Sequence, residues 1–133
     1  MSAFEEIYQL YMRYADGIDK RDYPKARAVF ADGSTVIGVA SQGPVDEFFA
    51  TVEQSMLNWG KSMHLVGNVL TDIDEAAGTA HADCTTVVYF LEPVGEGDET
   101  VRAVSYSDTL RKSPEGWRIV ERRIAKIWEK QGL

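Results

Sequence analysis

The stretch SMHLVGN, residues 62–68, marks the point at which the hydrophobic pattern of the chain changes. Before it, apolar residues recur at steps of three and four, which is typical of amphipathic helices, and after it runs of β-branched and aromatic residues are typical of strands. Helices followed by strands predict an α+β fold. The same stretch places His64, one of two histidines, inside an apolar run.

Four long strands are expected from this point onward, over residues 61–73, 79–91, 100–112 and 117–128. They are separated by turns at 74–78 and 113–116 and by an acidic loop, EPVGEGDE, at 92–99. Connections of this kind join hairpins, so the strands are expected to pair antiparallel.

The segment before them is expected to contain three helices and one short strand. The first helix is expected over residues 2–20, where Ser2 and Glu5 have the spacing of a capping box. A second, short helix starts at Asp22 with Pro24 in its first turn, and Asp32-Gly33 is expected to end it. A strand is expected at 34–39, and a third helix between Gly43-Pro44 and Trp59-Gly60.

The bulk composition limits the classes of function. A chain of 133 residues, 44% hydrophobic and 26% charged, fits one globular domain over residues 1–133. A net charge of −7 argues against nucleic acid or an anionic membrane surface as a partner, because both require a basic face. The start of the chain is acidic where a secretion signal is basic, and no apolar run approaches the length of a membrane span, so we expect a cytoplasmic protein.

Neither a metal nor a cofactor is expected. The two histidines are far apart, Cys84 is the single cysteine, and no ligand set with metal spacing exists. The chain also contains no glycine-rich nucleotide-binding motif.

Asp19 is the second residue that requires an explanation. It follows Ile18 at the end of the first helical pattern and lies on or beside the apolar face, where an unpaired charge is costly. Asp19 either caps the helix or pairs with Lys20 or Arg21 in solvent, or it accepts a hydrogen bond from His64. The last arrangement would leave the other imidazole nitrogen as a base. The 45-residue separation does not decide between these alternatives.

Other polar groups are candidates for the same cavity. Tyr14 lies one turn before Ile18 and could donate its hydroxyl group. By strand alternation, Asn68 is expected to share the face of His64. Tyr89 lies in the next expected strand, 79–91, where its hydroxyl group could also reach the cavity. We take Asn68 and Tyr89 as candidate substrate-binding residues.

Three segments resemble the SnoaL-like group of the NTF2-like superfamily: RYADGIDKRDYPKARAVFADG (13–33), SMHLVGN (62–68) and YSDTLRKSPEGWRIVERR (106–123). The resemblance covers essentially the whole chain. It implies a cone-shaped α+β barrel, in which a curved mixed or antiparallel sheet wraps around about three N-terminal helices and leaves an apolar pocket. It also implies a homo-oligomer, often formed sheet to sheet, and a small apolar molecule as the ligand.

Within that group, the chain is similar to scytalone dehydratase, bile-acid 7α-dehydratase and hexachlorocyclohexane dehydrochlorinase. The resemblance implies a catalytic Asp19–His64 dyad, with Tyr14 facing the substrate. It also makes Lys126 a candidate substrate-binding residue, because Lys126 falls near the position of an arginine in the bile-acid enzyme. It therefore implies a cofactor-independent lyase that acts on a small cyclic substrate. An isomerase or polyketide cyclase with the same dyad, or a protein that only binds a ligand, are the alternatives.

Overall fold

The computed structural model describes residues 1–38 and 41–133. In chain order its elements are α1 (Ala3–Asp19), α2 (Tyr23–Arg27), β1 (Phe30–Ile37), β2 (Gln42–Pro44), α3 (Val45–Met56), β3 (Trp59–Asp74), β4 (Thr79–Pro93), β5 (Thr100–Ser113) and β6 (Gly116–Gln131). The strands form one sheet in the order β2-β1-β6-β5-β4-β3, with β1 parallel to β6 and all other pairs antiparallel.

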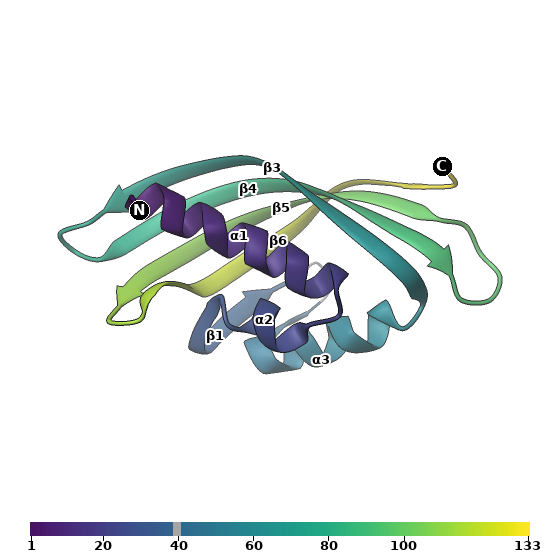
Figure 1. Cartoon of the computed structure of the whole chain (residues 1–133), viewed down its shortest axis with the longest axis horizontal. Helices are drawn as coiled ribbons and strands as arrows, with labels where there is room; N and C mark the ends of the chain where they lie inside the picture. Colours follow the sequence, from purple (N-terminus) through teal and green to yellow (C-terminus); the bar gives the residue numbers. More distant parts are fainter. Residues whose placement is uncertain (39–40) are drawn as a thin grey trace.

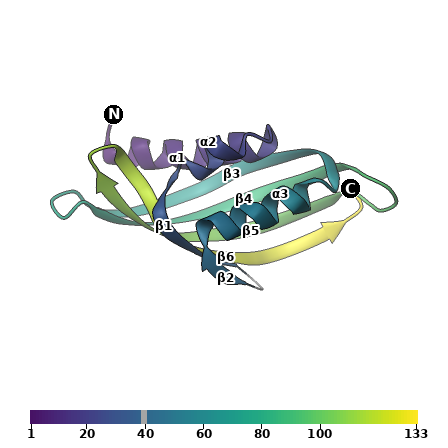
Figure 2. The same cartoon turned by 90° about the horizontal axis from the view of Figure 1, so that it is seen from below.

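The sheet is curved and its two edges do not meet, and the helices lie on its concave side (Figures 1 and 2). We call the face toward the helices the inner face and the opposite one the outer face. This arrangement confirms the predicted α+β fold with a mixed sheet wrapped on three helices.

Helix α1 packs against the inner face of the sheet with the apolar stripe seen in the sequence. Its capping box forms as predicted: the Ser2 hydroxyl accepts from the Glu5 amide at 3.1 Å. The buried stripe includes Ile7, Leu10, Tyr11, Tyr14 and Ile18. Where α1 meets α2, a Cβ on Gly17 would lie 2.7 Å from the Ala26 nitrogen, so this crossing requires glycine.

Two predicted boundaries are wrong, and one strand was not expected. Asp32 and Gly33 do not end a helix but lie within β1, where Gly33 adopts a φ of +78° and the register with β6 shifts. Trp59 begins β3 instead of closing α3, and the short strand β2 was not anticipated. The predicted end of the first strand, Val39, lies outside the described residues.

A β-bulge in β3 also overturns the predicted position of Asn68. The pairing with β4 shifts register between Val66 and Val69, because one extra residue enters β3 there. The inner face therefore continues from His64 through Val66 to Val69, while Asn68 is exposed. Simple alternation fails at the bulge, and Asn68 does not share the face of His64.

Candidate active site

Asp19 and His64 are in direct contact. Asp19 is the last residue of α1, and His64 lies on the inner face of the edge strand β3. The Asp19 Oδ1 atom is 2.7 Å from the His64 Nδ1 atom, and the His64 backbone N–H donates to Oδ2 at 2.6 Å. The carboxylate is thus bound by both the ring and the backbone of one residue.

Two further residues hold the Asp19 carboxylate in place. The Ser62 hydroxyl donates to Oδ1 at 2.8 Å. Arg21, just beyond α1, donates from Nη1 to the same hydroxyl at 2.8 Å and to the Ile18 carbonyl at 2.9 Å. The end of α1 is therefore tied to the start of β3, and the solvent pairing of Asp19 with Lys20 or Arg21 does not occur. Lys20 instead pairs with Asp16 at 2.9 Å.

The electrostatics favour an ionised Asp19. Burial alone would raise the pKa of this carboxyl, but the hydrogen bonds from the His64 ring, the His64 amide and Ser62 outweigh it and lower the pKa below its usual value. An ionised Asp19 accepts a hydrogen bond from the protonated Nδ1 of His64. In the neutral form of the ring, this arrangement leaves the lone pair on the other nitrogen, Nε2.

His64 lines a cavity of about 360 Å³, which is within the range of small-molecule sites. The cavity lies between α1, α3 and the inner face of β4, β5 and β6. Most of its wall is apolar, including Ile18, Val52, Met56, Val88, Phe90 and Ile124. The polar groups in the wall include Tyr14, His64, Tyr106, Glu47 and Arg102.

Tyr14 and Tyr106 supply phenol groups to this wall. Tyr14 is 5% exposed and its ring stands edge-on to the His64 ring, with ring centres 6.3 Å apart. Burial raises the pKa of Tyr14 and of Tyr106, so both keep their protons at neutral pH. Each remains a hydrogen-bond donor in a wall that is mostly apolar.

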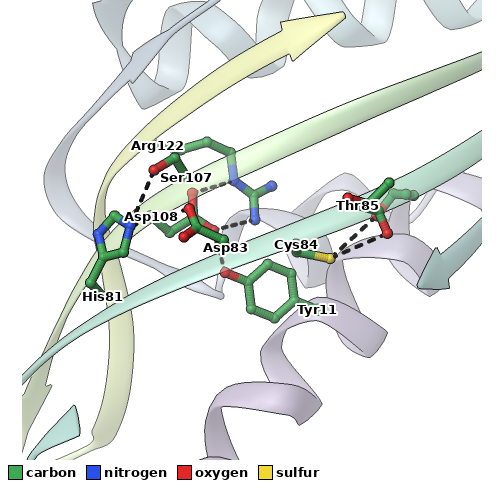
Figure 3. A network of polar contacts seen from close by, with 9 residues as sticks. Tyr11, His81, Asp83, Cys84, Thr85, Ser107, Asp108 and Arg122 are labelled. Carbon is green, nitrogen blue, oxygen red and sulfur yellow. Dashed lines mark hydrogen bonds and ion pairs between the residues drawn. The ribbon is translucent and has the colours of Figure 1, made fainter. Parts of the chain in front are cut away.

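A fully buried ion pair lies next to the two tyrosines. Arg122 on β6 donates to Asp108 on β5 from Nε at 3.0 Å and from Nη2 at 2.9 Å, and the Tyr11 hydroxyl donates to Asp108 at 2.7 Å (Figure 3). The Arg122 guanidinium lies 3.9 Å from the centre of the Tyr106 ring and 4.7 Å from that of Tyr14. This network joins α1 to the centre of the sheet and packs against the rings that line the cavity.

The structure does not bring the other three sequence candidates to the cavity wall. Asn68 is exposed beyond the β-bulge. Tyr89 lies on the outer face of β4, between Val88 and Phe90, which both face the cavity. Lys126 is exposed, with Nζ 3.9 Å from Glu129.

Four residues of the site were not selected from the sequence. Ser62 and Arg21 hold the Asp19 carboxylate, and Tyr106 and Arg102 line the cavity. Strand alternation could have found two of them, because Arg102 and Tyr106 lie on the same side of β5 as Asp108. No local signal identifies Arg21, whose role depends on where α1 meets β3.

No cluster of three or more His, Cys, Asp or Glu side chains suited to a metal ion is found in residues 1–38 and 41–133. In the same residues, no helix combines the length and apolar character needed to cross a bilayer.

Comparison with known sequences assigns the family. A SnoaL-like domain matches residues 1–123, so the chain belongs to the SnoaL-like family. An uncharacterized protein of Mycobacterium tuberculosis is 25% identical over 130 residues, which cover 94% of this chain and 86% of that protein. The resemblance noted in the sequence is confirmed at the level of the family.

Solved structures show the same fold. A candidate scytalone dehydratase from Novosphingobium aromaticivorans superposes with a TM-score of 0.86 at 16% identity, covering 98% of this chain and 87% of that one. A hexachlorocyclohexane dehydrochlorinase from Novosphingobium barchaimii gives 0.81 at 13% identity, covering 96% and 88%. An NTF2-like protein with a cystatin-like fold from Novosphingobium aromaticivorans gives 0.72 at 24% identity, covering 92% and 80%.

Proposed function

We propose that this protein is a cofactor-independent lyase that eliminates water, or a similar leaving group, from a small apolar cyclic molecule. The observation that carries the proposal is the 2.7 Å contact between Asp19 and the ring of His64 at the wall of an apolar cavity. Solved structures with a similar fold include proteins described as a dehydratase and a dehydrochlorinase, which agrees with elimination chemistry.

In this mechanism, His64 is the general base and Asp19 orients it. Nε2 takes a proton from a carbon of the substrate, and the electron pair of that C–H bond forms the new double bond as the leaving hydroxyl departs. Asp19 stabilises the imidazolium that forms. Return of the proton from Nε2 to the departing hydroxyl yields water, so His64 ends the cycle neutral.

Tyr14 is proposed to donate a hydrogen bond to the carbonyl or leaving oxygen of the substrate. Its phenol stays protonated because burial raises its pKa, and it lies beside His64 in the cavity wall. A donor aimed at an oxygen that gains negative charge lowers the barrier of such a step.

Proton abstraction can be tested before the natural substrate is known. The wild-type protein should exchange deuterium from heavy water into the carbon next to the carbonyl of 2-tetralone, measured by mass spectrometry. His64→Gln and Asp19→Asn should each lower the rate by about 10²- to 10⁴-fold. His81→Gln is the matched control, because His81 is exposed on the outer face beside Asp83 and Ser107 (Figure 3).

The outcomes separate the alternatives. The proposal would be contradicted if the wild-type protein exchanged deuterium no faster than buffer, or if His64→Gln exchanged it as fast as wild type. Either result would favour a protein that only binds ligands. An isomerase or cyclase with the same dyad would also exchange deuterium. Product mass then decides, because dehydration removes one water and isomerisation leaves the mass unchanged.

A further inference from the structure

Arg102 is the one cationic side chain among the described residues that line the cavity. It lies on the inner face of β5, and its guanidinium stacks 4.9 Å from the centre of the Phe90 ring, which also lines the cavity. Its side chain is 40% exposed, which places it where the cavity meets solvent. Phe90 therefore holds the plane of the guanidinium at the entrance of an apolar site.

The hydrogen bonding of Arg102 leaves part of its donor set available. Its Nε donates to Glu129 at 2.6 Å, and this is its one side-chain hydrogen bond within the described residues. The two terminal nitrogens, which form the donor fork that suits a carboxylate, make no such bond in that part of the chain. Glu129 thus fixes the orientation of the guanidinium without using its fork.

The local charge also favours an anion at this entrance. Glu129 is shared by two cations, Arg102 and Lys126, the latter at 3.9 Å, so this group of three carries a net positive charge. The described wall also contains one carboxylate, Glu47 on α3. The protein as a whole has a net charge of −7, so this positive group differs in sign from its surroundings.

Strand pairing gives the position of Arg102 relative to His64. His64 pairs with Val88, and Val88 pairs with Arg102, so the three residues lie on one rung of the sheet with side chains on the inner face. Two strand spacings put the backbones of His64 and Arg102 roughly 10 Å apart. A molecule of one or two rings spans this distance.

We propose that the cavity takes a carboxylate-bearing cyclic substrate, with the carboxylate on the Arg102 fork and the apolar ring directed toward His64. Arg102 is thereby a specificity-determining residue at the opposite end of the substrate from the dyad. The inference rests on the proposed function in one respect, which is that this cavity holds the substrate. It narrows that substrate from an apolar cyclic molecule to an apolar ring that carries a carboxylate.

The test compares 2-naphthoate with 2-naphthamide, which share a ring system and shape but differ in charge. Calorimetric titration of the wild-type protein should give at least about 10-fold tighter binding of the naphthoate, as expected for a hydrogen-bonded charge pair. Arg102→Gln should reduce naphthoate to the affinity of the amide and leave amide binding unchanged. Arg102→Lys should retain part of the preference, because it keeps the charge but loses the fork.

Two control variants make the result specific. Glu129→Gln should bind naphthoate as tightly as wild type or more tightly, since it removes a negative charge next to the site. His64→Gln should keep the naphthoate preference even where it abolishes deuterium exchange, which separates this inference from the lyase proposal. Equal affinities of the two probes for wild type, or a preference that survives Arg102→Gln, would overturn it. Failure of both probes to bind would also overturn the inference, whereas the lyase proposal is decided by the deuterium-exchange experiment.

Discussion

At the scale of single residues, Asp19 connects stability to the proposed chemistry. Its carboxylate accepts from the His64 ring, the His64 amide and Ser62. Each of these bonds favours the charged form, and the pKa of Asp19 is lowered although burial opposes this. These hydrogen bonds would hold His64 in place as the base during proton transfer. They also stabilise the folded protein while Asp19 is ionised.

This linkage predicts the pH dependence of stability. Because the folded-state pKa lies below the ordinary value of 3.8, Asp19 contributes stability above that value, and the contribution is lost as the pH falls through the folded-state pKa. Urea unfolding should therefore show wild type more stable than Asp19→Asn near pH 6, with the difference shrinking below about pH 4. In a His64→Gln background the difference should be smaller at every pH. A difference that is constant with pH would contradict this account.

Residue patterns alone identified both members of the dyad as possible cavity residues but not their contact. Periodicity put Asp19 beside the buried face of its helix and His64 at the start of a strand, and the family resemblance joined them. Asn68 was misplaced because a bulge changes which side of the strand each later residue faces. Arg21 was not recognised, because its bonds to Ser62 and Ile18 depend on tertiary packing.

At the scale of elements, a buried charge network attaches α1 to β5 and β6. Asp108 and Arg122 are both 0% exposed, and Tyr11 donates to Asp108 from the buried side of α1. Removing one partner of such a pair leaves an uncompensated buried charge, whereas replacing both with apolar side chains is often tolerated.

We therefore expect Arg122→Met to lower the free energy of unfolding by about 3–5 kcal/mol in urea titrations. The double variant Asp108→Leu/Arg122→Met should regain much of that loss. Tyr11→Phe should cost less, about 1–3 kcal/mol, since Arg122 still satisfies Asp108. A loss below about 1 kcal/mol in Arg122→Met would show that the pair is not a main attachment of the helix.

The elements differ in how well the sequence predicts them. The long strands β3 to β6 and the helix α1 follow strong local periodicity, and their predicted positions agree with the structure within a few residues. The parallel pairing of β1 with β6 joins segments far apart in the chain, and no local pattern signals it. Strand β2 has three residues, which is too short for any periodicity.

In the molecule as a whole, the outer face of the sheet exposes large apolar side chains that no helix of residues 1–38 and 41–133 covers, since those helices lie on the concave side (Figure 1). One rung of this face runs from Leu65 through Val87 and Ala103 to Trp128 across four strands. Leu65 is 58% exposed and Trp128 is 47% exposed. Exposed apolar surface of this kind marks an interaction site, and the sheet-to-sheet homo-oligomer that the family resemblance implies would cover it.

In sedimentation experiments we expect the wild-type protein to be an oligomer and Leu65→Glu to be a monomer, because the substitution places a charge on the apolar outer face. Leu70→Glu is the matched control: Leu70 is on the same strand and is 74% exposed, but its rung continues through the polar residues Asp83 and Ser107. This control should leave the oligomer intact. Since Leu65 points away from the cavity, neither variant should abolish probe binding at Arg102. A wild-type protein that sediments as a monomer, or equal dissociation by both variants, would contradict the proposed interface.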